Sequence, residues 1–435
     1  MTTAHLPKSA AYVVVGMGMH GMSTAWHLAM ELERSGKGKG SDVVLIDKSG
    51  PGAGATGIAC GCVRNLYMTS PIHNILRHSV DVWQSDPVNF GFQQVGYVSV
   101  GEGNQQTDYE KMHKSQNAAG YKSDVYVGKE AKSFLKKIWP DFNVEKADVV
   151  LHEIPSGYAG THTAVRALKE KCDQWGVRSF AGISVEGYDM QNGRITGVIT
   201  SEGTIKADAV VICAGAWITK HWEWLGLPDK LDMRYPDGGV VKDADMWTYW
   251  RLLEGEVLLK DGHKYRTGDD KDPPVLHVEL MNTPVITENG HKFPDQHFYM
   301  YVRYAAERAG AKAVLDPYGH ANDLYQADAW FKDYYMATLA YLFDQFKNYG
   351  SQFKQRRNGG IGAFTPDSVP IYDWVADNGY MIADSTHGYK MIGVGKLVAR
   401  HLVSGEPVPE LSPFAFTRFA QGRTFGDRNS NCPWV

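Results

Sequence analysis

The sequence predicts an α/β fold organised around a parallel sheet, and three observations lead to this prediction. An apolar run from Tyr12 to Val15 has the composition of a buried strand. A glycine-rich turn and a segment with helical periodicity follow it, and a second apolar run occupies 43–46. Strand, helix and strand in this order form a crossover unit that places the two strands parallel in one sheet.

The turn after the first strand has the pattern G-x-G-x-x-G, which is typical of dinucleotide-binding proteins. Gly16 permits the tight strand-to-helix turn, Gly18 lets a pyrophosphate approach the backbone, and Gly21 lets the helix pack against the strand. The helix that begins there directs free N–H groups at the phosphates, so we expect Met19 and His20 at the cofactor. A turn without a ligand is the alternative, and the flanking strand and helix disfavour it.

Asp47 ends the second strand, where an acidic side chain would hydrogen-bond a ribose 2′-hydroxyl. A polar, glycine-rich loop at 34–41 delays this acid beyond the usual spacing of about 20 residues. An acid at this place fits NAD or FAD and disfavours the 2′-phosphate of NADP. The residue beside it and a loop of small side chains are expected to line the same site: Lys48, Gly54, Ala55 and Thr56.

Composition is that of an ordinary globular protein, with 43% hydrophobic and 22% charged residues among 435. A formal charge of −4 argues against nucleic acid as a main partner. The N-terminus lacks the features of a secretory signal, and no apolar run approaches the roughly 18 residues of a membrane span. Five scattered cysteines indicate a reducing compartment, and no zinc-ligand spacing is present. We therefore expect a cytoplasmic protein without a metal.

The α/β pattern returns along the chain. We expect helices near 72–83, 129–138, 163–175 and 393–402, and strands near 95–100, 195–199, 208–217 and 379–383. Between about 228 and 355, charged loops separate strand-like pieces at 256–260 and 297–304, and an aromatic helix is expected at 327–349. The nucleotide-binding half is therefore predicted to be discontinuous, with an inserted domain that supplies the substrate side.

Four motifs in a fixed order resemble the D-amino-acid oxidase superfamily of flavoproteins, closest to its sarcosine oxidase and glycine oxidase branch. They are the glycine fingerprint with its acid, the loop that ends at Arg64, the strand and turn at 210–217, and the C-terminal segments 365–367 (T-P-D) and 387–390 (H-G-Y-K). The resemblance covers nearly the whole chain and is sparse at about 228–300. It implies FAD as the cofactor, which the fingerprint alone does not distinguish from NAD.

The resemblance also implies the architecture. An FAD-binding Rossmann-like domain of the glutathione-reductase type would be discontinuous, formed by 1–90, 150–227 and 355–435. An α+β substrate domain with a mixed or antiparallel sheet would comprise 91–149 and 228–354. The implied cofactor contacts outside the fingerprint are Val185, Ala214, Gly215, Trp217, Gly360, Gly362, Gly388, Tyr389 and Lys390.

Noncovalent FAD is expected because the usual attachment residues are absent. Some relatives tether FAD through a cysteine shortly before the T-P-D motif, where this chain has Gly360. Others use a histidine in the early glycine loop, where Ile58 stands. An aromatic residue that closes the pocket in the family is replaced by Gly362, which leaves the pocket shape and the substrate open.

Arg64 is the sharpest candidate for the substrate. It follows a loop of very small residues, and a guanidinium is permanently charged and grips a carboxylate through two hydrogen bonds. An arginine at this place in the sarcosine oxidase branch binds the substrate carboxylate. A structural arginine that ties the loop to the FAD phosphates or to a neighbouring acid remains the alternative.

Four further residues are expected near the reacting atoms. Gly388 and the helix after it would place N–H donors by the flavin pyrimidine, where reduction leaves negative charge. Lys390 would add a positive charge there and, by resemblance, meet the substrate carboxylate, and His387 belongs to the same motif. Lys312 resembles the family's lysine over the flavin that stabilises developing superoxide. For Lys312 and Lys390, a solvent-exposed lysine is the alternative.

The predicted reaction is oxidation of a secondary amine or N-methyl amino acid to an imine, by hydride transfer to flavin N5. Such transfer requires the C–H bond within about 3–3.5 Å of its acceptor and no metal. The imine would hydrolyse, and O2 or another acceptor would reoxidise the flavin. Three alternatives stay open: an NAD-linked dehydrogenase, a flavin enzyme for a hydroxy acid or D-amino acid, and a flavin subunit that relays electrons in a hetero-oligomer. No membrane partner is expected.

Overall fold

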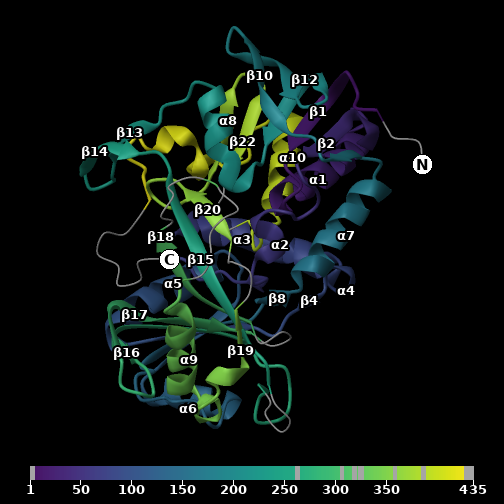
Figure 1. Ribbon diagram of the computed structural model, residues 1–435. Coiled ribbons are helices and arrows are strands. Elements are labelled where there is room, and N and C mark those ends of the chain that lie inside the picture. Colours follow the sequence, from purple (N-terminus) through teal and green to yellow (C-terminus); the bar gives the residue numbers. More distant parts are fainter. Residues whose placement is uncertain are drawn as a thin grey trace.

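A computed structural model describes residues 5–259, 265–303, 308–315, 321, 328–355, 360–383 and 388–425. Two large sheets occupy opposite ends of the molecule, and the long strand β15 (Thr248–Val257) runs between them (Figure 1). This arrangement confirms the predicted α/β class with a second, mixed sheet.

Parallel strands form the centre of the larger sheet. β9, β2, β1, β12 and β22 lie side by side in this order and are parallel to one another. β21 continues the sheet antiparallel to β22, and the hairpin β10–β11 extends it from the first half of β12. The bounds are β1 Ser9–Val15, β2 Val43–Asp47, β9 Arg178–Ala181, β10 Val185–Gln191, β11 Arg194–Thr200, β12 Gly203–Ile212, β21 Ile371–Ala376 and β22 Gly379–Ala383.

Alternating side chains of β1 bury both faces of this sheet. Val14 packs in the core formed with helices α1 (Met19–Ser35), α7 (Thr161–Gln174) and α10 (Val394–Ser404). Val13 and Val15 face the opposite way, toward β10, β11 and α8 (Ile218–Trp224). Strands buried on both faces read as continuous apolar runs, which is why 12–15 and 43–46 were visible in the sequence.

The smaller sheet has five strands in the order β17, β16, β5, β7 and β6, with β16 parallel to β5 and the other neighbours antiparallel. One face carries Val98, Val100 and their neighbours and is covered by α6 (Lys129–Ile138) and α9 (Phe331–Leu342). Tyr97 precedes Val98 on β5, and its side chain lies on the other face of the sheet. The bounds are β5 Tyr97–Gly101, β6 Ser123–Val127, β7 Val149–Glu153, β16 Val275–Ile286 and β17 Lys292–Val302.

The remaining elements form smaller groups between and beside these sheets. β15 pairs with β18, β19 and β20, and two small sheets are β3–β8–β4 and β13–β14. The bounds are β3 Cys62–Val63, β4 Phe92–Gln93, β8 Gly157–Ala159, β13 Lys230–Arg234, β14 Val240–Asp245, β18 Arg308–Leu315, β19 Phe353–Gln355, β20 Ile361–Phe364, α2 Ala55–Ile58, α3 Ser70–Ser85, α4 Pro87–Phe90 and α5 Gln106–Ala118.

Most predicted elements agree with the structure at their centres and differ at some ends. The strand predicted at 256–260 overlaps β15 only at 256–257, because β15 ends at Val257. α9 ends at Leu342, so the prediction of a helix to residue 349 is wrong at this end. Phe343 is extended and forms a β-bridge with Phe142, and this tertiary pairing stops the helix. The predicted domain boundary at 149–150 falls within β7, and the division into two domains stays a prediction.

Candidate active site

A cavity of about 640 Å³ lies at the carboxyl ends of the parallel strands. Val15 and Asp47, the last residues of β1 and β2, contribute to its wall. Across the cavity stand Tyr97, Tyr299 and Tyr301, from the face of the five-stranded sheet that is opposite α6 and α9. Open α/β sheets bind ligands beyond the carboxyl ends of their strands, and the volume is in the range of cofactor and ligand sites.

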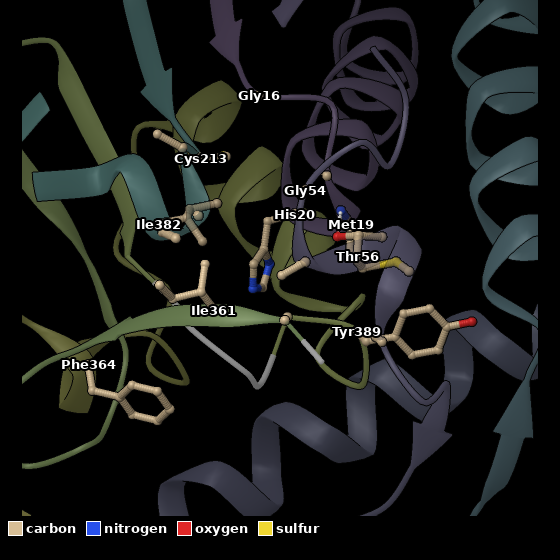
Figure 2. Close-up of a pocket in the computed structure, with 18 of the residues that line it drawn as sticks. Gly16, Met19, His20, Gly54, Thr56, Cys213, Ile361, Phe364, Ile382 and Tyr389 are labelled. Atoms are coloured by element: carbon tan, nitrogen blue, oxygen red, sulfur yellow. Dashed lines mark hydrogen bonds between the residues drawn. The ribbon is translucent and has the colours of Figure 1, made fainter. Parts of the chain in front are cut away.

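The glycine-rich turn between β1 and α1 lines this cavity, and backbone geometry fixes its shape (Figure 2). Gly16 has a φ of 103°, and a Cβ atom there would lie 2.3 Å from the carbonyl oxygen of Cys213. At Gly21 a Cβ atom would lie 1.8 Å from the carbonyl oxygen of Gly16. Larger residues therefore cannot occupy these two positions without moving the backbone, which fits the packing roles predicted for both glycines.

The amino end of α1 opens into the cavity. Gly18 caps the helix without a side-chain hydrogen bond, and the Met19 N–H donates to the Thr56 hydroxyl at 3.0 Å. The first N–H groups of a helix have no partner within the helix, and they carry its positive end. His20 and Thr56 line the cavity beside these groups, so the turn is built to receive an anion such as a pyrophosphate.

Asp47 holds its own loop as well as lining the cavity. Its carboxylate accepts N–H bonds from Met17 at 2.8 Å, Ser49 at 2.7 Å and Gly50 at 2.8 Å. A carboxylate has about four acceptor positions, so one remains for a ribose hydroxyl. The ribose contact was predicted from the sequence, whereas the backbone hydrogen bonds that Asp47 accepts within its own loop were not.

The far end of this half of the cavity is aromatic and cationic. The Lys48 ammonium lies 3.4 Å from the centre of the Trp217 ring, which is a cation–π contact. Val185, Ala214 and Gly215 line the wall next to this pair. A flat aromatic face beside a cation suits the adenosine end of a dinucleotide, so the residues present fit FAD.

The other half of the cavity contains Arg64 and Lys390. The Arg64 guanidinium donates to the Leu66 carbonyl oxygen and lies 4.8 Å from the centre of the Tyr67 ring. The Lys390 ammonium lies 5.9 Å from the centre of the same ring. Among the residues that the structure describes, Arg64 has no carboxylate partner in an ion pair. Two cations therefore converge on one aromatic side chain at the wall of the cavity.

Burial and the neighbouring acidic groups act on the pKa of the Arg64 guanidinium in opposite directions. Burial alone would lower the pKa of the Arg64 guanidinium, but the nearby Tyr67, Tyr97, Tyr299 and Glu153 more than offset burial and raise that pKa. Arg64 therefore stays charged. The Glu153 carboxylate is itself occupied, because it accepts hydrogen bonds from the Asn65 N–H at 2.7 Å, Ser156 and Gln116.

Three tyrosines form the wall opposite the flavin-family fingerprint, and the sequence did not single them out. Burial raises the pKa of Tyr97, Tyr299 and Tyr301, so all three keep their phenolic protons. Behind Tyr97 and Tyr299 lies His277, whose pKa burial lowers well below its usual value. The signal was the spacing of Tyr299 and Tyr301, which places both side chains on one face of a strand.

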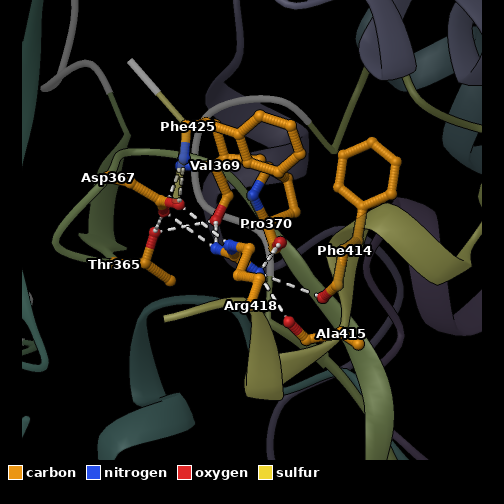
Figure 3. A network of polar contacts seen from close by, with 8 residues as sticks. All are labelled: Thr365, Asp367, Val369, Pro370, Phe414, Ala415, Arg418 and Phe425. Atoms are coloured by element: carbon orange, nitrogen blue, oxygen red, sulfur yellow. Dashed lines mark hydrogen bonds and ion pairs between the residues drawn. The ribbon is translucent and has the colours of Figure 1, made fainter. Parts of the chain in front are cut away.

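The T-P-D segment ends in a buried ion pair (Figure 3). Asp367 receives two hydrogen bonds of 2.8 Å from Arg418, and both side chains are fully buried. Arg418 also donates to the carbonyl oxygens of Val369, Pro370 and Phe414. Since Pro366 and Val369 line the cavity, this pair holds a stretch of its wall against the C-terminal segment.

The structure brings most of the predicted site residues to one cavity. The residues that line it are Gly16, Gly18, Met19, His20, Asp47, Lys48, Gly54, Ala55, Thr56, Arg64, Val185, Ala214, Gly215, Trp217, Gly360, Gly388, Tyr389 and Lys390. Gly21 and Gly362 do not line it. Gly21 packs against the Gly16 carbonyl oxygen, and Gly362 lies in β20 paired with Trp250, which lines the cavity instead. Lys312 lies in β18, but its side chain is outside the described part of the structure, as is the whole of His387.

Two features are absent from the described residues. No group of three or more histidine, cysteine, aspartate or glutamate side chains there is arranged to hold a metal ion. None of the described helices combines the length and the apolar content that crossing a bilayer requires.

Comparison with known proteins agrees with this site. The chain is 24% identical over 440 residues to 4-methylaminobutanoate oxidase (formaldehyde-forming) of Paenarthrobacter nicotinovorans, which covers 96% of this chain and 47% of that protein. It is 23% identical over 294 residues to sarcosine oxidase subunit beta of Rhizobium meliloti, covering 66% of this chain and 67% of that one. The chain thus spans less than half the length of several curated relatives.

A solved structure and a family model cover nearly the whole chain. L-proline dehydrogenase from P. horikoshii superposes with a TM-score of 0.74 at 20% identity, covering 96% of this chain and 99% of that one. This likeness shows that the two proteins share a fold. The family model described as FAD dependent oxidoreductase matches residues 11–401. The resemblance predicted from the sequence is confirmed, and the chain belongs to the DAO family of FAD-dependent oxidoreductases.

Proposed function

We propose that the chain oxidises a secondary amine or N-methyl amino acid to an imine, which then hydrolyses. The observation that carries this proposal is the approach of Arg64 and Lys390 to the Tyr67 ring inside the cavity that also holds the glycine turn. Relatives named for sarcosine and for 4-methylaminobutanoate support an N-methylated substrate. When bound, FAD supplies the two-electron acceptor for the substrate C–H bond.

Arg64 would bind and orient the substrate carboxylate through paired hydrogen bonds. Because the guanidinium has no carboxylate partner among the described residues, a ligand carboxylate would complete its charge pairing. Lys390 adds a second positive charge at the same ring. A substrate whose carboxylate is held in this way has its reacting C–H bond aligned.

The tyrosine wall would surround the substrate nitrogen. The phenol rings offer apolar surface against which the methyl group of the amine can pack, and their hydroxyl groups stay protonated at neutral pH. The described lining has two carboxylates: Asp47 accepts hydrogen bonds within its own loop, and Asp367 is paired with Arg418. No carboxylate of the described lining is therefore available beside Arg64 to accept a proton from the substrate nitrogen. The substrate accordingly reacts as the neutral amine.

The test is anaerobic mixing of the FAD-loaded protein with a panel of ligands. N-methyl and cyclic amino acids should bleach the flavin absorbance, with weak or no bleaching by primary D-amino acids and 2-hydroxy acids. Bleaching by hydroxy acids alone would overturn the amine assignment. The Arg64→Lys variant serves as the matched control, because it should weaken bleaching by carboxylate-bearing amines and leave FAD content unchanged.

A second candidate function is electron relay within a hetero-oligomer, and the similarity to a sarcosine oxidase subunit beta favours it. The isolated chain would then bind FAD and fail to bleach with any amine, and a partner protein would co-purify and restore turnover. The rate at which the reduced flavin is reoxidised in air distinguishes O2 from another molecule as the electron acceptor. We also propose a cytoplasmic location, supported by the four cysteines of the described residues, which are all free thiols.

A further inference from the structure

Two cysteines in the wall of the cavity have no part in the amine oxidation proposed above. Cys60 and Cys62 flank Gly61 in the loop that leads to Arg64, and both line the cavity. Cys60 is partly exposed, whereas Cys62 is buried at the start of β3, where it pairs with Tyr158. No zinc-ligand spacing was found among the cysteines of the sequence, and these two were assigned no role.

Backbone contacts fix the loop that carries the two thiols. Gly61 has a φ of 76°, and a Cβ atom there would lie 2.2 Å from the Ala159 carbonyl oxygen. The Gly61 carbonyl accepts the Ala159 N–H at 2.9 Å, and Arg303 donates to the Cys60 carbonyl at 2.5 Å. Cys60 and Cys62 are two residues apart in this loop, both line the cavity, and each thiol shifts the pKa of the other.

The surroundings distinguish the two thiols. The pKa of Cys60 is lowered to about 5, chiefly by the hydrogen bond from Cys62, with Tyr301 and the charge of Lys390 also contributing against burial. The pKa of Cys62 is raised by the same shared hydrogen bond and by burial. Cys60 therefore ionises first, while Cys62 remains a protonated donor beside it.

The other described cysteines lack both features. Burial raises the pKa of Cys172 to about 12 and also raises that of Cys213. The Cys172 thiol donates to the Met22 carbonyl oxygen at 3.3 Å and has no second thiol beside it. Both are inert structural thiols by the usual criteria of ionisation and access, and they provide internal controls.

We propose that Cys60 and Cys62 form a redox-active dithiol that a peroxide converts to a disulfide. The Cys60 thiolate attacks a peroxide oxygen, the O–O bond breaks, and hydroxide leaves as a sulfenic acid forms on Cys60. Cys62 then attacks the Cys60 sulfur, the S–S bond forms, and water leaves. Overall two thiols lose two electrons and two protons, and one hydrogen peroxide is reduced to two waters.

The test uses FAD-loaded protein that has been reduced, freed of reductant and treated with one molar equivalent of hydrogen peroxide. Alkylation under denaturing conditions and trypsin digestion follow. Trypsin cleaves after Lys48 and Arg64, so both cysteines fall in the single peptide 49–64. This peptide should resist alkylation and be lighter by two hydrogen atoms, and a thiol reductant should reverse the change. Peptides with Cys172 and Cys213 should remain alkylated.

Two variants separate the roles of the thiols. Cys62→Ser should stop the reaction at the Cys60 sulfenic acid, which a 1,3-dione traps. Cys60→Ser should slow peroxide oxidation of peptide 49–64 by about tenfold or more, since the ionised thiol is the nucleophile. Retention of both thiols in the wild type under excess peroxide, or equal oxidation of Cys172, would overturn the proposal. No amine substrate is used, so failure here is separate from failure of the proposed function.

Discussion

The two halves of the cavity are built by different means. In the half that we propose binds the nucleotide (the nucleotide half), backbone atoms set the shape: the Gly16 turn, the amino end of α1 and the N–H groups around Asp47. In the half that we propose binds the substrate (the substrate half), side chains set it: Arg64, Lys390 and tyrosines from a second sheet. The first half specifies what many dinucleotide proteins share, and the second half is free to vary with the substrate.

The first prediction tests the stretch of wall that Asp367 and Arg418 hold in place. Arg418→Met should lower the free energy of unfolding by about 3–5 kcal/mol, because it leaves the buried Asp367 carboxylate without its partner. Urea unfolding measures this loss. Arg34→Met, which removes an exposed ion pair with Glu31, is the control and should change stability little. Near-equal effects of the two variants would show that the buried pair is not structural.

This contrast also explains what could be predicted from the sequence. The fold and the nucleotide half were visible because glycines and apolar runs report local backbone requirements over short spans. Tyr97 and Tyr299 were not visible, since they meet at the cavity only through the parallel pairing of β5 with β16 and the hairpin to β17. The Arg418 partner of Asp367 was missed for the same reason: 51 residues separate them.

The second prediction concerns pH and the substrate half. His73 is buried, and its ring donates to the Tyr67 carbonyl oxygen at 2.6 Å, while burial lowers its pKa from 6.5 to about 4. Between these values the unfolded chain binds a proton that the folded chain excludes, so stability falls as the pH falls from 6.5 to about 4. The loss from this group is about 3 kcal/mol.

His73→Gln should therefore reduce the slope of unfolding free energy against pH in this window, by up to one proton. The exposed His5 provides the control, and His5→Gln should leave the slope unchanged. An unchanged slope in His73→Gln would mean that His73 titrates alike in the folded and unfolded chain.

The third prediction tests the claim that backbone shape governs the nucleotide half. Gly16→Ala meets both an unfavourable φ of 103° and a clash with Cys213, so it should cost about 3 kcal/mol and deplete bound FAD. FAD released per protein and thermal unfolding are the measurements. Gly36→Ala shares the positive φ without the clash, and it should keep FAD. Full FAD occupancy in Gly16→Ala would break the comparison between the halves.

The fourth prediction tests side-chain control of the substrate half. Arg64→Lys should weaken binding of carboxylate ligands by about 1.5–3 kcal/mol, the worth of a charged hydrogen bond, with normal FAD content. Ligand-induced changes in the flavin spectrum give the affinity. Arg77→Lys, in an ion pair with Asp81, is the control. Loss of FAD with unchanged ligand affinity would instead make Arg64 a structural residue of the cofactor loop.

The last prediction concerns a contact between two side chains in the nucleotide half. The Lys48 ammonium lies 3.4 Å from the centre of the Trp217 ring, and a cation–π contact contributes about 0.5–2 kcal/mol. Lys48→Met keeps the length of the side chain and removes the charge, so FAD affinity measured by fluorescence titration should fall by no more than this amount. Substrate-analogue affinity at saturating FAD should not change, because Lys48 and Arg64 contact different aromatic residues. If Lys48→Met depleted FAD as severely as Gly16→Ala, side chains rather than backbone would govern this half as well.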